Sequence, residues 1–94
     1  MNVGINYLRE HVDPTTRIHY SYLSAGEKPN IVPKYAAVHY FLRTKDLQYG
    51  YEVFERIKKI AQGAALMTET EHKITVNVMA AGCIQISAFN DFFY

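Results

Sequence analysis

The segment from Thr44 to Met67 constrains the fold most, because it has the pattern of one long amphipathic helix. Thr44 or Asp46 can cap its start, since their side-chain oxygens accept hydrogen bonds from first-turn amides. Apolar residues recur at helical spacing and form a stripe wide enough to lie on a sheet: Leu47, Tyr51, Phe54, Ile57, Ala61 and Ala64. A helix with one apolar stripe needs a partner layer, and the flanking sequence indicates strands.

The remaining segments are typical of a second helix and of several strands. Residues 1–11 have a helical apolar stripe and lack a capping residue at the start. Residues 15–24 and 70–80 alternate between apolar and polar, as strands with one buried face do. Residues 34–43 are apolar on both faces, which predicts a central strand. The order is therefore α-β-β-α-β, and residues 83–89 can form one more strand. We predict an α+β, ferredoxin-like two-layer sandwich that lacks its first strand.

Composition narrows the class of protein. The 94 residues suffice for a single domain, residues 1–94, and 49% of them are hydrophobic, which argues against disorder. Ten basic and nine acidic residues are spread along the chain, so we expect no nucleic-acid partner. No apolar run is long enough to span a bilayer, and we expect no membrane association. A single cysteine, Cys83, and the absence of a signal-peptide pattern predict a cytoplasmic protein.

The sequence offers no evident catalytic or metal centre. Its four histidines fall on four different elements, and none has the spacing of a zinc motif: His11, His19, His39 and His72. His19 and His39 could face each other across a strand pair, with Cys83 nearby, but this is too few ligands to predict a metal site. Cys83 is better interpreted as a small buried hydrophobe. An enzyme that uses His19 or His39 as a general base is the least favoured interpretation.

Asn30 and Arg43 are the candidate binding residues. Pro29 and Pro33 restrict the backbone on both sides of Asn30, whose amide can both donate and accept hydrogen bonds. Arg43 ends the predicted central strand, where its guanidinium can bind a carboxylate in bidentate fashion. The alternative is structural, with a turn asparagine and an arginine paired to Asp46. Physical reasoning alone favours this alternative.

Four stretches resemble a known family: "MNVGINYLREHV", "RIHYSYL", "PNIVPKYAAVHYFLRTKD" and "IKKIAQGAALMTET". Together they are similar to the lid, or dimerisation, domain of the zinc-dependent amidohydrolases that include aminobenzoyl-glutamate hydrolase, aminoacylase and carboxypeptidase G. The resemblance covers residues 1–80, whereas residues 81–94 form a divergent tail. It implies that Asn30, in "NIVP", and Arg43, in "YFLRT", contact the amide or carboxylate of a substrate. The zinc or similar metal of such enzymes is expected in a separate catalytic domain, and this chain is expected to need no cofactor.

Two functional hypotheses follow from the resemblance. In the first, the chain is an isolated or truncated lid domain that self-associates, as a homodimer or higher assembly, and has no catalytic activity alone. The missing first strand would leave an unpaired sheet edge, and the divergent tail could fill the vacant strand position. In the second, the chain is an independent ferredoxin-like module that binds a small acidic ligand through Asn30 and Arg43.

Overall fold

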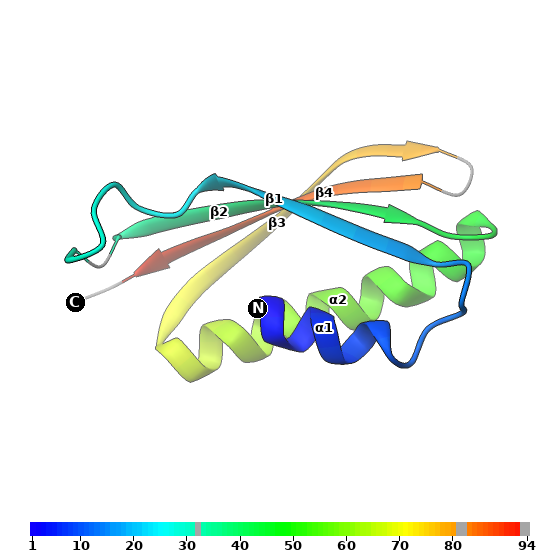
Figure 1. Ribbon diagram of the computed structural model, residues 1–94, viewed down its shortest axis with the longest axis horizontal. Helices are drawn as coiled ribbons and strands as arrows, with labels where there is room; N and C mark the ends of the chain where they lie inside the picture. Colours follow the sequence, from blue (N-terminus) through cyan, green and yellow to red (C-terminus); the bar gives the residue numbers. More distant parts are fainter. Residues whose placement is uncertain (32, 81–82, 93–94) are drawn as a thin grey trace.

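The computed structural model describes residues 1–31, 33–80 and 83–92. Within these ranges the chain forms two helices and four strands, in the order α1 (Asn2–Arg9), β1 (Arg17–Ser24), β2 (Tyr35–Arg43), α2 (Leu47–Thr68), β3 (Thr70–Ala80) and β4 (Cys83–Phe92). Both helices lie against the same face of the sheet, and no described helix covers the other face (Figure 1). The predicted two-layer α+β sandwich is confirmed.

The sheet has the strand order β1-β2-β4-β3, and all neighbouring strands are antiparallel. β2 is central, as its apolar sequence predicted. β4 lies between β2 and β3, so much of the divergent tail is a central strand. β2, α2 and β3 therefore form a split β-α-β unit with β4 in the gap. The order of a ferredoxin-like domain is not reproduced along the chain, because this central strand comes last instead of first.

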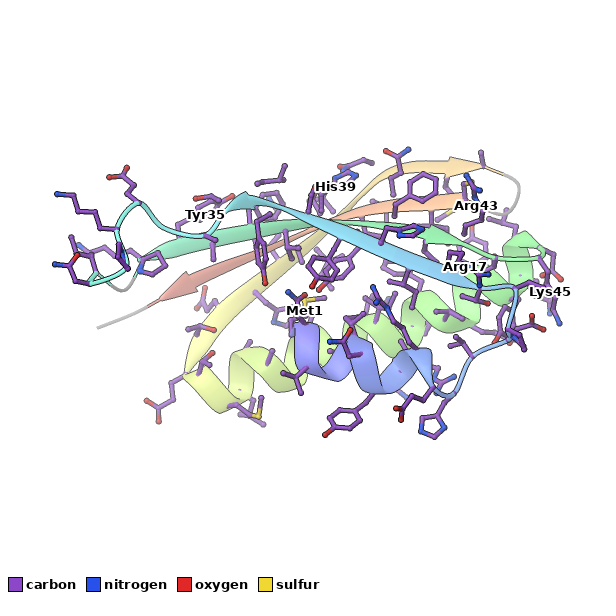
Figure 2. The ribbon with its side chains drawn as sticks, viewed as in Figure 1. Met1, Arg17, Tyr35, His39, Arg43 and Lys45 are labelled. Carbon is purple, nitrogen blue, oxygen red and sulfur yellow. The ribbon has the colours of Figure 1, made fainter. Side chains whose placement is uncertain are left out.

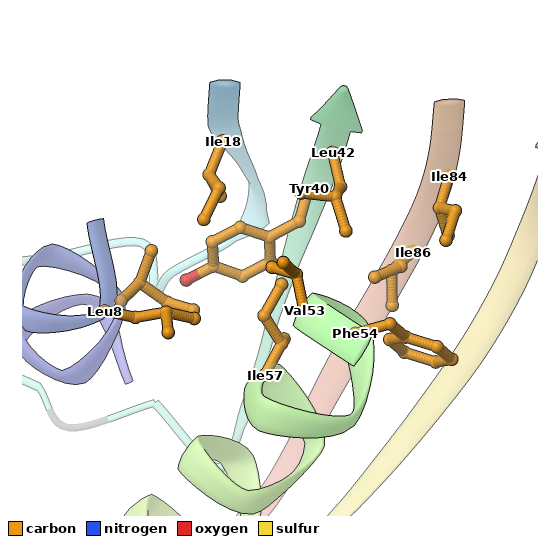
Figure 3. Packing of buried hydrophobic residues seen from close by; sticks show 10 residues of the cluster. Leu8, Ile18, Tyr40, Leu42, Val53, Phe54, Ile57, Ile84 and Ile86 are labelled. Atoms are coloured by element: carbon orange, nitrogen blue, oxygen red, sulfur yellow. The ribbon is translucent and has the colours of Figure 1, made fainter. Parts of the chain in front are cut away.

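The core lies between the sheet and the helices (Figure 3). Each described element except β3 contributes to the buried cluster, which contains Ile5, Leu8, Ile18, Tyr40, Leu42, Val53, Phe54, Ile57, Ile84 and Ile86. Ile84 and Ile86 of β4 are each 1% exposed, so the last strand supplies the middle of the core. Burial of side chains of this size contributes roughly 1.5–3 kcal/mol each.

Polar contacts fix the position of α1 on the sheet. The hydroxyl of Tyr40 donates to the side-chain oxygen of Asn2, and the Asn2 amide donates to the hydroxyl of Tyr22. Burial raises the pKa of the Tyr40 hydroxyl well above its usual range, with smaller contributions from Tyr22 and Tyr20. Tyr40 therefore stays protonated at neutral pH and remains a donor. These contacts hold α1, which has no side-chain cap at its start.

The ends of α2 have different chemistry. Asp46 is the N-cap, and its carboxylate accepts a hydrogen bond of 2.8 Å from the amide of Tyr49. Thr44 instead donates from its hydroxyl to the carbonyl of Asp46. At the other end the chain leaves the helix through Glu69, which has a left-handed backbone with φ of 55°. Glycine is the residue that adopts this conformation without a steric cost, so Glu69 carries local strain.

Candidate functional site

The face of the sheet away from the helices carries the polar and charged side chains of the strands. His39 and Arg43 both lie on this face (Figure 2). Near its centre, the Ser87 hydroxyl lies 3.3 Å from Nδ1 of His39 and accepts a 2.7 Å hydrogen bond from the Asn77 amide. Towards one end, the rings of Tyr35 and Phe89 are 5.9 Å apart. This open face, formed by alternate residues of the strands, is the surface to which a ligand or partner has access.

Arg43 lies at the end of β2, exposed to solvent, with its guanidinium 5.7 Å from the ring centre of Phe41. Arg17 of β1 is its Cα partner across the ladder. In the described part of the chain, neither arginine has a carboxylate within ion-pair distance. The structural alternative, in which Arg43 pairs with Asp46, is therefore wrong: the Asp46 carboxylate caps α2. The guanidinium of Arg43 is thus available to a carboxylate from outside the chain.

Asn30 lies in the exposed loop between β1 and β2. The loop turns where the amide of Ile31 donates to the carbonyl of Lys28, at 3.3 Å, and where Gly26 adopts a φ of 102°. Pro33 packs over Gly26, within 3.4 Å of the position a Cβ would take, so the proline does restrain this loop. Val32 of the "NIVP" motif lies outside the described residues.

The structure does not bring Asn30 and Arg43 together within one chain. Asn30 precedes β2 and Arg43 ends it, and the strand between them runs nearly the length of the sheet (Figure 2). At about 3.3 Å per residue, the eight steps from Tyr35 to Arg43 span about 26 Å. A small molecule that touches Arg43 is therefore far from Asn30 of the same chain.

The histidines and Cys83 do not assemble into a centre. His19 lies opposite Phe41 and His39 opposite Ser21, so the two histidines do not face each other directly. Cys83 is half-buried and lies opposite Arg43. Within residues 1–31, 33–80 and 83–92, no three His, Cys, Asp or Glu side chains are placed to hold a metal ion. These residues therefore do not fit the metal of a hydrolase.

His39 and Ser87 form a serine–histidine contact that sequence reasoning did not find. The two residues are far apart in sequence, and only the strand order brings them together. Ser87 is 5% exposed, and its hydroxyl already accepts a hydrogen bond from Asn77. A nucleophilic serine needs an accessible oxygen and a histidine oriented by an acid, and no carboxylate in the described ranges forms a hydrogen bond or ion pair with His39. The contact is therefore structural.

No helix in the described part of the chain combines the length and apolar character needed to cross a bilayer. This holds for α2, which has 22 residues but charged residues along one side. The finding agrees with the amphipathic pattern of its sequence, whose apolar stripe packs on the sheet.

Two curated relatives match much of the chain. Over 71 residues it is 42% identical to a p-aminobenzoyl-glutamate hydrolase of Escherichia coli (strain K12), in a match that covers 74% of this chain and 15% of that protein. Over 65 residues it is 30% identical to Xaa-Arg dipeptidase of Mus musculus, in a match that covers 69% of this chain and 15% of that protein. No protein-family model matches the chain, and no solved structure matches it.

The fold and these similarities define a class first. The chain is a two-layer α+β unit that corresponds to a short part of much longer hydrolases, since it spans 15% of the length of each relative. It belongs to the amidohydrolase/peptidase family that includes aminobenzoyl-glutamate hydrolase. The resemblance read from "NYLREH", "NIVP" and "GAALMT" is thus confirmed at the level of the family.

Proposed function

We propose that this chain is a lid-type dimerisation domain of a metal-dependent amidohydrolase, which contributes subunit contact and carboxylate binding but breaks no bond itself. The observation that carries the proposal is its similarity to hydrolases over 15% of their length. A metal-bound water and its ligands would belong to another part of an intact relative. The single cysteine, which leaves no internal disulfide, supports a reducing, cytoplasmic setting.

The outer edge of β1 supports self-association. β1 is the first strand in the sheet order, so its side away from β2 has no strand neighbour among the described residues. Tyr22 and Leu23 on this strand are each 58% exposed. An edge strand with exposed apolar side chains pairs readily with a second copy of itself. We therefore assign the subunit contact to an antiparallel pairing of β1 with the partner's β1.

Such a pairing would also relate Asn30 and Arg43. Within one chain the two residues lie at opposite ends of β2, whereas an antiparallel two-fold pair turns the second chain end for end. The loop that carries Asn30 in one chain then lies at the same end of the joined sheet as Arg43 in the other chain. Substrate contacts implied by the resemblance would in this way come from two subunits.

Sedimentation across a concentration series tests self-association. We expect dimers or larger assemblies at high protein concentration, and we expect Leu23→Lys to shift the equilibrium towards monomer by introducing charge at the pairing edge. Met67→Lys on α2, where Met67 is 80% exposed, is the matched control and should leave association unchanged. A monomer at all concentrations in the parent chain would contradict the dimer proposal.

The alternative function, an independent module that binds a small acidic ligand, makes a different prediction. Calorimetric titration with aminobenzoyl-glutamate should then show saturable binding by the isolated chain, and Arg43→Ala should abolish it. Arg43 carries this alternative alone, because Asn30 is about 26 Å away along β2. No saturable binding, together with concentration-dependent assembly, favours the lid domain.

A further inference from the structure

A pocket of about 270 Å³ lies where the end of α1 leads into the start of β1. Its lining includes two arginines, Arg9 from α1 and Arg17 from β1, together with Asp13, Thr16 and His19. Arg43 is not among the lining residues, so this pocket is separate from the carboxylate contact proposed above. Two guanidiniums, a hydroxyl and an imidazole around one cavity have the chemistry of an anion site.

Backbone carbonyls hold both guanidiniums in place. Nη2 of Arg9 donates to the carbonyl of Ile18. Nη1 of Arg17 donates to the carbonyls of Pro14, at 2.7 Å, and Thr16, at 3.0 Å. In each arginine these contacts use one nitrogen of a group that has five N–H donors, so both arginines are positioned and keep donors for a ligand. Within the described ranges neither arginine has a carboxylate at ion-pair distance.

Asp13 lines the same pocket, but its charge is balanced. Its Oδ1 accepts hydrogen bonds from the hydroxyl of Thr15, at 2.6 Å, and from the amide of Thr15, at 2.9 Å. Its Oδ2 lies 3.4 Å from Nζ of Lys45. The hydrogen bonds from Thr15, followed by the smaller effect of Lys45, lower the pKa of Asp13. The carboxylate is therefore ionised and paired, and the charges of Arg9 and Arg17 remain uncompensated.

Thr16 gives an independent indication of a ligand. The residue is 7% exposed, and its hydroxyl oxygen is buried with no hydrogen-bond partner in the described part of the chain. Buried hydroxyls are normally hydrogen-bonded, because leaving one unpaired costs roughly 1–3 kcal/mol. Thr16 lies between the two arginines in sequence and in the wall of the pocket, so a bound oxyanion could supply the missing partner.

We propose that this pocket binds a small oxyanion, a carboxylate or a phosphate, between the guanidiniums of Arg9 and Arg17, with the hydroxyl of Thr16 as a third partner. The planar donor forks of arginine match both kinds of oxyanion and form charge-assisted hydrogen bonds with them. The anion's source is either free inorganic phosphate or a molecule that carries a carboxylate.

Titration of the full chain followed by ¹H–¹⁵N NMR tests the site. Sodium phosphate and sodium acetate are added in separate experiments at about pH 7, with ionic strength held constant by sodium chloride, because salt screens exposed charges. We expect saturable shifts at the amides of Thr16, Arg17 and Ile18 and at Nε of Arg9. Saturation by phosphate alone identifies the phosphate source, and saturation by acetate identifies the carboxylate source.

Variants separate this site from ordinary surface charge and from the proposed function. Arg9→Gln and Arg17→Gln should each weaken binding by about tenfold or more, because each removes a charge-assisted hydrogen bond. Arg56→Gln is the matched control, because Arg56 also donates to one backbone carbonyl, that of His11 at 3.3 Å, and is not a lining residue. Arg43→Gln should leave the titration unchanged, although it removes the carboxylate contact proposed for the open face.

Two results would overturn the proposal. The first is a set of linear shifts that sodium chloride reproduces at equal ionic strength, and the second is saturable binding that survives in Arg17→Gln. Should Arg9→Gln fail to fold through loss of its contact with Ile18, Arg17→Gln and Arg9→Lys decide the matter. Arg9→Lys keeps the charge but loses the planar fork, so weakened binding in a folded variant supports the geometry proposed.

Discussion

Arg17 and Arg43 are directly opposite each other in the β1–β2 ladder, and in the described part of the chain no carboxylate lies within ion-pair distance of either. Like charges at directly opposite positions destabilise a strand pair. Two arginines in this arrangement cost stability, and an external anion would offset that cost. The relationship therefore links the stability of the empty domain to the ligand chemistry proposed for it.

The first prediction concerns this pair. Arg43→Glu should stabilise the folded chain by roughly 0.2–1 kcal/mol, because it replaces a repulsion with a cross-strand ion pair to Arg17. The measurement is urea unfolding at low salt. Arg43→Gln, which removes the repulsion without adding an attraction, should fall between the parent and Arg43→Glu. Equal stability of all three chains would show that the two charges do not interact.

The second prediction tests the central position of β4. Ile86→Ala should lower the free energy of unfolding by about 2–5 kcal/mol, because Ile86 is 1% exposed and the substitution leaves a cavity in the core. Ile86→Val, expected to cost about 0.5–1.5 kcal/mol, gives a measurable value if the alanine variant does not fold. Gln85→Ala on the open face of the same strand is the control. A loss below about 0.5 kcal/mol in Ile86→Ala would exclude a core position.

The third prediction concerns the unpaired hydroxyl of Thr16. Thr16→Val should raise the free energy of unfolding by about 1 kcal/mol, because it replaces a buried, unpaired oxygen with a methyl group of similar size. Thermal unfolding in a buffer without phosphate or carboxylate is the measurement. Thr15→Val is the neighbouring control and should not stabilise, since the Thr15 hydroxyl donates to Asp13. Destabilisation by Thr16→Val would mean that the hydroxyl has a partner.

The fourth prediction concerns the end of α2. Glu69→Gly should stabilise the chain by roughly 0.5–1 kcal/mol, because glycine adopts the left-handed conformation found there without the steric cost of a Cβ. Glu52→Gly, within the same helix, should instead cost about 1 kcal/mol. Chemical denaturation of the two variants gives opposite signs if the backbone of Glu69 is left-handed, and the same sign otherwise.

Local patterns predicted the elements that depend on neighbouring residues. The apolar stripe of α2, its capping by Asp46 and the central place of β2 all follow from residues close together in the sequence. The position of β4 could not be predicted in the same way. Its place between β2 and β3 depends on pairing between segments far apart in the chain, and a two-residue alternation does not specify which strands will be its neighbours.

The candidate site shows the same division. Arg43 was identified as a strand-end arginine, and its place at the end of β2 is confirmed. Its opposition to Arg17 depends on the register set across the β1–β2 loop, so the sequence alone did not reveal it. The separation of Asn30 from Arg43 could have been predicted, because the nine-residue strand between them fixes a distance of about 26 Å. One site that contains both residues therefore requires a second chain.

The position of β4 has a consequence for how the domain is made. Synthesis proceeds from the N-terminus, so the ribosome produces β2 and β3 before the strand that lies between them. Until residues 83–92 emerge, the facing edges of β2 and β3 have no partner and the core lacks Ile84 and Ile86. Native packing therefore awaits the last strand, and during that interval the nascent chain exposes two strand edges that can pair with other chains.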